Sequence, residues 1–363
     1  MTSVVQVLAA LIALLGHLIS GGASAPPARS VPLAHLIGQK LVVRIDGRRP
    51  DAEILGRIRR GQVGGVILYR GRNYATARQL RSIASTLQSA AAAAGRPPLL
   101  IAVDQEGGAV KQVPWAPPTR SPPQMGADNS AAEALDQGTA TGTALRALGV
   151  NMDFAPVADV PATPRSFMLQ SGRTWSSSAI RTSTLANLFA TGLEHVGVVP
   201  VMKHFPGLGY ADLNTDSHVE KIAASRAQLA AGLVPYRTAI SAHVPMIMLS
   251  NAVYDAYDGA NAAGWSATIA TRLLRGELGF RGVSITDSLD GAAHARRMAD
   301  APLAIRAARA GADMILVTGS EATSESVYAS LAAAVRDGTL SRGQLEASYR
   351  RIRALKRMLE RRA

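Results

Sequence analysis

The stretch Val283-Ser284-Ile285-Thr286-Asp287-Ser288-Leu289 indicates the fold of this chain better than any other segment. It begins as a short apolar run with β-branched residues, which is typical of a buried strand. The run ends on the carboxylate of Asp287, which the packing of such a strand does not require. A similar segment at residues 201–207, about eighty residues upstream, carries Lys203 and His204. Two polar strand ends of this kind predict one functional site on the rim of a parallel barrel.

Short apolar segments alternate with longer amphipathic segments outward from this stretch in both directions. The predicted strands are residues 41–45, 65–69, 99–103, 152–157, 199–205, 246–250, 283–286 and 314–318. The predicted helices are residues 52–59, 74–94, 131–148, 178–195, 226–242, 269–278, 299–310, 321–336 and 341–359. Eight strands that alternate with helices predict a single-domain α/β fold, a (β/α)8 barrel of the TIM type. The alternative is an open doubly wound sheet, but Asp46-Gly47-Arg48 lacks the glycine-rich phosphate turn expected after its first strand.

Composition narrows the class of protein. With 363 residues, 47% of them hydrophobic, the chain can bury a large core, so we exclude a disordered protein. Its 39 Lys and Arg against 26 Asp and Glu give a net charge of +13, which raises nucleic acid or an anionic surface as a partner. The basic residues are not interleaved with aromatic ones, so we predict solvated helix faces and no nucleic-acid partner. Cysteine is absent, which excludes disulfides, thiolate metal sites and cysteine nucleophiles.

The first 25 residues have the pattern of an export signal. Residues 4–19 are almost entirely apolar, and Ala23-Ser24-Ala25 has the small-x-small form of a signal-peptidase site. We interpret residues 1–25 as a signal peptide and residues 32–363 as the folded domain, with no stable membrane span after processing. An uncleaved anchor or a mis-assigned start is the alternative, because no Lys or Arg precedes the apolar run and Pro26 follows the cleavage site.

Polar residues stand at the ends of five predicted strands. They are Asp104, Asp153 with Asp159, Lys203 with His204, Asn251, and Asp287. Because the carboxyl ends of barrel strands meet at one face, these side chains should converge there. A single Asp after a strand is often the N-cap of the next helix, and this structural role is the alternative for Asp287. The loop at residues 160–177 has no predicted helix or strand, and we expect it to lie over the barrel mouth.

Three of these segments carry a family resemblance. Asp104-Gln105-Glu106-Gly107-Gly108, Lys203-His204-Phe205-Pro206-Gly207 with the later Asp216-Ser217-His218, and Ile285-Thr286-Asp287 resemble the signature blocks of glycoside hydrolase family 3. They are most similar to those of its single-domain β-N-acetylglucosaminidases of the NagZ type, and the resemblance covers residues 35–358. It implies a retaining exo-β-N-acetylglucosaminidase that hydrolyses terminal β-linked N-acetylglucosamine in cell-wall glycans.

The resemblance also implies catalytic roles. Asp287 matches the nucleophile, which forms a glycosyl-enzyme ester, and His218 matches the acid/base, with Asp216 orienting its ring. The loop after Lys203 is, however, about two residues longer than the family pattern. Strict spacing would place Asn214-Thr215-Asp216 where the family has Asp-Ser-His, and Asp216 would then be the proton donor. We favour His218, because a loop absorbs an insertion readily, but the sequence leaves both assignments open.

Four further residues match the family's sugar-binding positions. Asp104 would accept hydrogen bonds from sugar hydroxyls, Lys203 and His204 would bind hydroxyls as well, and Arg173 would orient the substrate. The chain departs from the family pattern after Gly108, where Ala109 and Gln112 replace arginines and Lys111 lies between them. This change removes guanidinium groups from the rim and bears on specificity, because a lysine does not reproduce a planar guanidinium fork.

The spacing of the histidines suggests no metal-ligand cluster, and the sequence contains no glycine-rich phosphate turn. We therefore expect no metal and no cofactor. The expected partner is a carbohydrate substrate containing N-acetylglucosamine, and the expected location is secreted or cell-wall associated. The positive charge would favour retention in an anionic cell wall. Alternatives are a β-glucosidase or β-xylosidase of the same family, an N-acetylglucosaminide phosphorylase, and a non-catalytic glycan-binding barrel.

Overall fold

The computed structural model describes residues 31–362, and the predicted signal peptide lies outside this range. Eight parallel strands form one sheet in the order β12-β9-β7-β6-β3-β2-β1-β13. They are β1 (Leu41–Arg44), β2 (Gly65–Ile67), β3 (Leu100–Val103), β6 (Met152–Asp153), β7 (Val199–Phe205), β9 (Met246–Leu249), β12 (Val283–Thr286) and β13 (Ile315–Val317). The two strands at the ends of this order, β12 and β13, meet through a parallel bridge between Ile285 and Met314, which closes the sheet. The predicted (β/α)8 barrel is confirmed, and the open doubly wound sheet is wrong.

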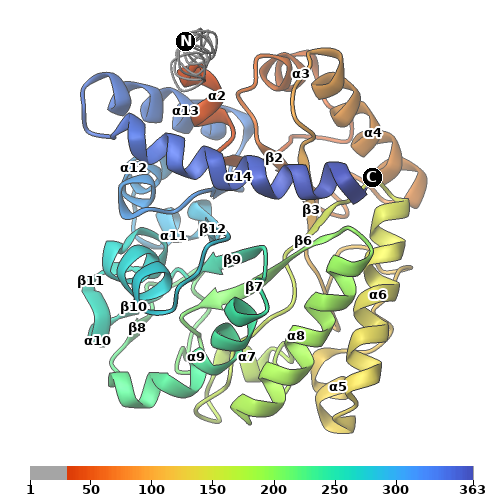
Figure 1. The fold of residues 1–363 in the computed structure, drawn as a ribbon, viewed down its shortest axis with the longest axis vertical. Helices are drawn as coiled ribbons and strands as arrows, with labels where there is room; N and C mark the ends of the chain where they lie inside the picture. Colours follow the sequence, from red (N-terminus) through yellow and green to blue (C-terminus); the bar gives the residue numbers. More distant parts are fainter. Residues whose placement is uncertain (1–30, 363) are drawn as a thin grey trace, which may run out of the picture. The chain divides into compact units, whose positions relative to one another are not determined.

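Helices follow the strands as the sequence predicts (Figure 1). The major ones are α3 (Ala52–Arg59), α4 (Ala77–Ala93), α6 (Ala131–Ala147), α8 (Ala179–His195), α9 (Arg226–Ser241), α12 (Asp300–Ala310), α13 (Glu321–Arg336) and α14 (Arg342–Arg362). Side-chain caps fix many of their starts, as where Thr76 accepts a hydrogen bond from the Gln79 amide at the start of α4. The segment predicted at residues 269–278 is η2 (Thr268–Glu277), which winds as a π-helix.

Several short elements were not predicted, because they are too short to show a hydrophobic period. They are α2 (Leu33–Gly38), the hairpin β4 (Gln105–Gly107) and β5 (Val110–Lys111), α5 (Pro122–Asp128), α7 (Phe167–Gln170), β8 (Lys221–Ile222), β10 (Val253–Tyr254), α10 (Asp255–Asp258), β11 (Gly259–Ala262), η1 (Ala263–Trp265) and α11 (Leu289–Ala295). The loop at residues 160–177 therefore contains one helix, α7, where none was predicted. It is tied to the loop after β7, where the Ala162 amide donates to the Gly209 carbonyl at 2.9 Å.

The last helix, α14, closes the end of the barrel at which the strands begin. Ile352, Leu355 and Leu359 pack against the barrel-interior side chains, in one buried cluster. Lys356 Nζ donates to the Gly64 carbonyl just before β2, and to Gln39 Oε1, both at 2.7 Å. In Figure 1, α14 runs across the region of the strands. With this end sealed, a ligand would enter from the opposite face, where the strands end.

No helix within residues 31–362 combines the length and apolar character that a bilayer crossing requires.

Candidate active site

Asp287 stands directly after β12, at the open end of the barrel. Its amide donates to the Leu249 carbonyl at 2.9 Å, which continues the β9–β12 ladder, and its Oδ1 accepts from the Ser288 amide at 2.8 Å. The N-cap of the next helix, α11, is Ser288, so the alternative of Asp287 as a helix cap is wrong. Asn251 fixes the turn by donating to the Ser288 carbonyl at 2.8 Å. Asp287 is therefore not the N-cap of α11. The residue is partly exposed.

The ends of β3 and β7 are joined by ion pairs. Lys203 Nζ lies 2.8 Å from Asp104 Oδ1 and 2.6 Å from Glu106 Oε1. Arg173, from the loop that contains α7, forms a bidentate pair with Glu106 at 2.7 and 2.8 Å. The Glu106 side chain is 1% exposed and that of Asp104 is 21% exposed. Glu106 therefore holds the two cations from inside, and Asp104 remains accessible to a ligand.

The charges of this network set the ionisation of Glu106. Burial alone would raise the pKa of Glu106, but the neighbouring Lys203 and Arg173 outweigh burial and lower this pKa to about 2. Glu106 is thus a permanent anion at neutral pH. It anchors Lys203 and Arg173 in fixed positions, so that both cations present their remaining donors at the barrel mouth.

His204 is held by a second buried carboxylate. Its Nδ1 lies 2.7 Å from Asp159 Oδ2, and Asp159 Oδ1 accepts from the Leu208 amide at 2.7 Å. Asp159 is fully buried. The contact through Nδ1 leaves Nε2 as the ring nitrogen available to a ligand.

Asp153, at the end of β6, supports the β3 loop from below. Its Oδ1 accepts from the Gln105 amide at 2.9 Å, and its side chain is fully buried. Burial raises the pKa of Asp153 to about 8, so this carboxyl group is largely protonated at neutral pH. A neutral acid here holds the Asp104-Gln105 turn in place without adding a further charge to the site.

Asp216 lies on the loop after β7 and faces Asp287. The residue keeps solvent exposure, yet enough protein surrounds its carboxyl group that burial, with repulsion from Asp287 as the second cause, raises the pKa of Asp216 to about 6. His204 and Arg173 act in the opposite direction. The Asp216 carboxyl group is therefore within electrostatic range of Asp287, His204 and Arg173.

The backbone of Asp216 rests against α11. A Cβ on Gly291 would lie 2.6 Å from the Asp216 carbonyl oxygen and 3.1 Å from its Cβ, so only glycine fits at this position. Because α11 directly follows Asp287, this contact fixes the height of the Asp216 loop relative to the end of β12.

His218 lies two residues further along the same loop and is exposed. Its Nδ1 lies 3.0 Å from Ser217 Oγ, and its amide donates to the Asn214 carbonyl at 2.9 Å. Within the described residues, no hydrogen bond joins its ring to the Asp216 carboxylate.

Tyr69 and Glu106 are two site residues to which the sequence assigned no role. Burial raises the pKa of Tyr69 above its usual range, and the charges of Asp104, Asp216 and Asp287 raise it further. Its hydroxyl group therefore lies within electrostatic reach of all three carboxylates. Its position as the last residue of the predicted strand at residues 65–69 is a signal that could have identified it.

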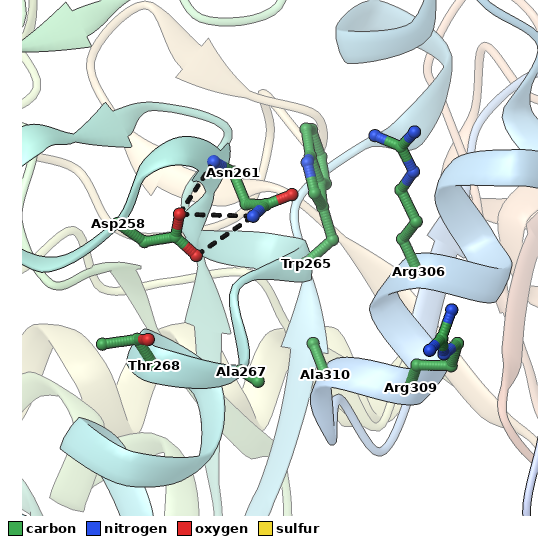
Figure 2. Close-up of a pocket in the computed structure, with 8 residues that line it drawn as sticks. All are labelled: Asp258, Asn261, Trp265, Ala267, Thr268, Arg306, Arg309 and Ala310. Atoms are coloured by element: carbon green, nitrogen blue, oxygen red, sulfur yellow. Dashed lines mark hydrogen bonds between the residues drawn. The ribbon is translucent and has the colours of Figure 1, made fainter.

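A hollow elsewhere in the protein contains none of the barrel-mouth residues described above (Figure 2). It has a volume of about 300 Å³, and Asp258, Trp265, Arg306 and Arg309 are among the residues that line it. The Asp258 carboxylate already accepts from Ser266 Oγ at 2.7 Å and from Asn261. Because its one acid is satisfied, this hollow lacks a free catalytic group, and the barrel mouth is the candidate site. Across residues 31–362 there is no group of three or more acidic or histidine side chains suited to hold a metal.

Comparison with known proteins agrees with the fold and identifies the family. Residues 33–355 match the model of the glycosyl hydrolase family 3 N terminal domain. A protein described as an uncharacterized secreted glycosyl hydrolase, from Arthroderma benhamiae, is 34% identical over 342 residues, which are 93% of this chain and 97% of that protein. A beta-hexosaminidase from Pseudomonas aeruginosa is 34% identical over 295 residues, which are 80% of this chain and 86% of that protein.

Solved structures show the same architecture. A glycoside hydrolase family 3 beta-N-acetylglucosaminidase from Paenibacillus sp. superposes with a TM-score of 0.87 at 31% identity, over 92% of this chain and 64% of that one. This chain thus spans about two thirds of that longer protein. A beta-N-acetylhexosaminidase from Beutenbergia cavernae superposes with a TM-score of 0.82 at 31% identity, over 91% of this chain and 99% of that one. The family match over residues 33–355, the relatives above 30% identity and the shared barrel fold together establish that this chain belongs to glycosyl hydrolase family 3 and is a glycoside hydrolase.

Proposed function

We propose that this protein is an exported, retaining exo-β-N-acetylglucosaminidase that removes terminal β-linked N-acetylglucosamine from glycans of the cell-wall type. The observation that carries the proposal is the place of Asp287 at the open end of the barrel, with the Asp216 backbone against the helix that follows it, and burial and repulsion from Asp287 raise the pKa of Asp216 to about 6. Retaining glycosidases use two such carboxyl groups, one ionised and one protonated. The names of the bacterial hexosaminidase relatives support the choice of sugar.

In the first step, an Asp287 oxygen attacks the anomeric carbon. The bond between that carbon and the leaving oxygen breaks, and the Asp216 proton passes to the leaving oxygen. The product is a glycosyl ester on Asp287, and Asp216 is left ionised. In the second step, Asp216 takes a proton from water, the water oxygen bonds to the anomeric carbon, and the ester bond to Asp287 breaks. Both catalytic groups return to their starting states.

The assignment of the proton donor to Asp216 rests on its position. After burial, Asp287 is the second largest cause of its raised pKa, whereas the His218 ring, on the same exposed loop, contacts Ser217 and forms no hydrogen bond with Asp216 among residues 31–362. A histidine donor at position 218, oriented by Asp216, is the competing assignment. Azide discriminates between them, since it replaces a lost acid/base in the second step and rescues only the variant that lacks it. Asp216→Ala should be rescued by azide, and His218→Ala should lose less activity and gain little from azide.

Sugar hydroxyls would be bound by the network around the mouth. Asp104 accepts from vicinal hydroxyls, and Lys203 and His204 contribute through Nζ and Nε2. Arg173, held by Glu106, orients the ring beside them. Retention by an anionic wall is part of this proposal, and the name of the secreted fungal relative supports export.

A comparison of two nitrophenyl sugars tests the function. Purified protein should hydrolyse nitrophenyl β-N-acetylglucosaminide in preference to nitrophenyl β-glucoside, and Asp287→Asn should abolish turnover. A preference for the glucoside would indicate a β-glucosidase instead. Release of sugar 1-phosphate only in the presence of phosphate would indicate a phosphorylase. Sugar binding without turnover of either substrate would indicate a non-catalytic glycan-binding barrel.

A further inference from the structure

A hollow of about 420 Å³ opens at the closed end of the barrel, beside α14. Pro245 and Gly282 line it directly before β9 and β12, so it lies where these strands begin. The candidate active site lies at the other end of the same strands. We call this space the basal hollow, and the basic residues that line it are His243, Arg281, Arg350, Arg351 and Arg361.

One face of α14 supplies most of these cations. Arg350 and Arg361 are separated by about three helical turns, so their side chains leave the helix on the same side. Ala354 and Met358 lie between them and give the hollow an apolar floor. Arg281, in the turn before β12, adds a cation from the barrel side. Basic groups from two separate segments thus surround one concave space.

Two acids close to these cations in the fold or the sequence are already paired. The buried Asp313 pairs with Arg351 at 2.6 Å and also with Arg275, so one carboxylate serves two guanidinium groups. Glu360, the only acid between residues 350 and 361, pairs with Arg353 at 3.4 Å. Among residues 31–362, no acidic side chain lines the hollow, so its positive charge is not neutralised there.

Three guanidinium groups of the basal hollow are left for a ligand. Arg281, Arg350 and Arg361 are exposed and form no ion pair within the described residues. A guanidinium fork matches the oxygens of a phosphate or a carboxylate, with which it forms charge-assisted hydrogen bonds. Because the three groups line one concave space, the potential there attracts an anion more strongly than an isolated surface arginine does.

The lining of the hollow favours an anionic polymer over a nucleic acid or a membrane. No aromatic side chain in the described part of the chain lines it, so a nucleic-acid base would find no surface for stacking. None of the large hydrophobic side chains exposed within residues 31–362 lines it either, so it has no group to insert into a bilayer. A polymer of phosphate or carboxylate groups requires neither feature.

We propose that the basal hollow is a docking site for an anionic polymer without aromatic bases, whose phosphate or carboxylate groups bind Arg281, Arg350 and Arg361. This inference rests on the retention by an anionic wall that forms part of the proposed function, and it assigns that retention to one surface. It does not depend on the catalytic roles. Because the hollow lies at the closed end of the barrel, a bound polymer leaves the barrel mouth open to substrate.

Binding of two polymers to the purified protein tests this site. Long-chain inorganic polyphosphate carries phosphate groups and polygalacturonate carries carboxylate groups, so calorimetry with each separates the two kinds of anion. At least one polymer should bind at about 0.15 M salt. Arg281→Gln and Arg350→Gln should each weaken its Kd roughly threefold to tenfold, and lower the slope of log Kd against log salt by about one.

Arg78→Gln on α4 and Arg237→Gln on α9 are the matched controls. Each removes one exposed arginine that forms no ion pair within the described residues and does not line the hollow. Both should change the Kd by less than about twofold, because their charges act on the polymer only through screened solvent. If they weaken binding as much as Arg281→Gln does, the net charge alone attracts the polymer and the docking site is refuted.

Other outcomes would also overturn the proposal. These are the failure of both polymers to bind, and tighter binding of phosphatidylglycerol vesicles or of oligothymidylate, which would make the partner a membrane or a nucleic acid. Saturating polymer should leave the KM for nitrophenyl β-N-acetylglucosaminide unchanged, and competitive inhibition would place the polymer at the barrel mouth instead. If this glycoside is not hydrolysed at all, the proposed function fails, and calorimetry still decides the docking site.

Discussion

The protonation of Asp216 makes the pH profile of this enzyme a direct test of the proposed mechanism. Burial and the charge of Asp287 raise the pKa of Asp216 to about 6, and the protonated form is the one that donates to the leaving group. Activity should therefore be present below this pKa and lost as the pH rises through it. The protonated fraction falls from about 0.9 at pH 5 to about 0.1 at pH 7, roughly a tenfold loss in kcat/KM for a substrate that needs acid assistance.

A comparison of substrates with different leaving groups identifies the residue that acts as the general acid. Chitobiose leaves as a poor, basic alkoxide and requires the proton, whereas a dinitrophenolate leaves without one. Asp216→Asn should lower kcat/KM for chitobiose by about 10²- to 10⁴-fold and should have a much smaller effect on the dinitrophenyl glycoside. The descending limb near pH 6 should disappear in this variant. Asp212→Asn is the matched control, because Asp212 lies on the same loop and pairs with Arg165 at 3.0 Å.

Either of two results would refute this reasoning. The first is a limb near pH 6 that persists in Asp216→Asn. The second is a limb that disappears in His218→Gln but not in Asp216→Asn, which would assign the proton to the histidine and reduce Asp216 to an orienting group.

Three further predictions concern the helix that supports Asp216, the ion pairs of Lys203, and the buried Lys356 at the sealed end of the barrel. Gly291→Ala should displace the Asp216 backbone and lower kcat/KM for chitobiose by roughly tenfold or more, while Gly276→Ala, whose added Cβ would have no neighbour closer than 3.8 Å, should not. Lys203→Met removes the ammonium group that pairs with Glu106 and Asp104. Because the buried Glu106 then has one counter-ion fewer, the free energy of unfolding in denaturant titrations should fall by about 3 kcal/mol. Adding Glu106→Gln should restore much of that loss, and an additive double variant would contradict the pairing. Burial lowers the pKa of Lys356 to about 7, so the unfolded chain binds one proton more than the native protein above that pH, and stability should rise between pH 7 and 9. Lys356→Met should remove up to about 1.4 kcal/mol per pH unit of this slope, and exposed Lys221→Met should not.

The barrel could be predicted from the sequence because each of its strands carries its own signal. Residues 283–286 form a β-branched apolar run that ends on a carboxylate, and Thr76 with Gln79 forms a capping box at the start of α4. These patterns are local, so the order of strands and helices follows without knowledge of tertiary contacts. The π-helical winding of η2 has no comparable signal, since an apolar face over ten residues fits either helical period.

The part played by Glu106, and the choice between Asp216 and His218 as proton donor, could not be predicted in the same way. Glu106 pairs with Arg173, 67 residues away in sequence, and with Lys203 on another strand end, so its function exists only once three segments meet. Which residue of the 208–218 loop lies nearest Asp287 also depends on contacts with segments that are distant in sequence. Spacing allows either Asp216 or His218 to face the nucleophile. The contact between Asp216 and Gly291 on α11 fixes the height of the loop, and a pattern read along the chain contains no such information.

The charged residues at the barrel mouth give a physical reason why Glu106 is ionised while Asp216 tends to keep its proton. Asp216 is within electrostatic range of Asp287 and Asp104, and Lys203 and Arg173 form ion pairs with Glu106. Both cations pair with Glu106 and lower its pKa, and Lys203 also pairs with Asp104. Asp216 has no ion-pair partner within the described residues, so burial, with repulsion from Asp287 as the second cause, favours the proton on Asp216. In the proposed mechanism, the ion pairs that hold the proposed sugar-binding residues also leave Asp216 without a cation of its own, so one arrangement of charges would serve both substrate binding and proton donation.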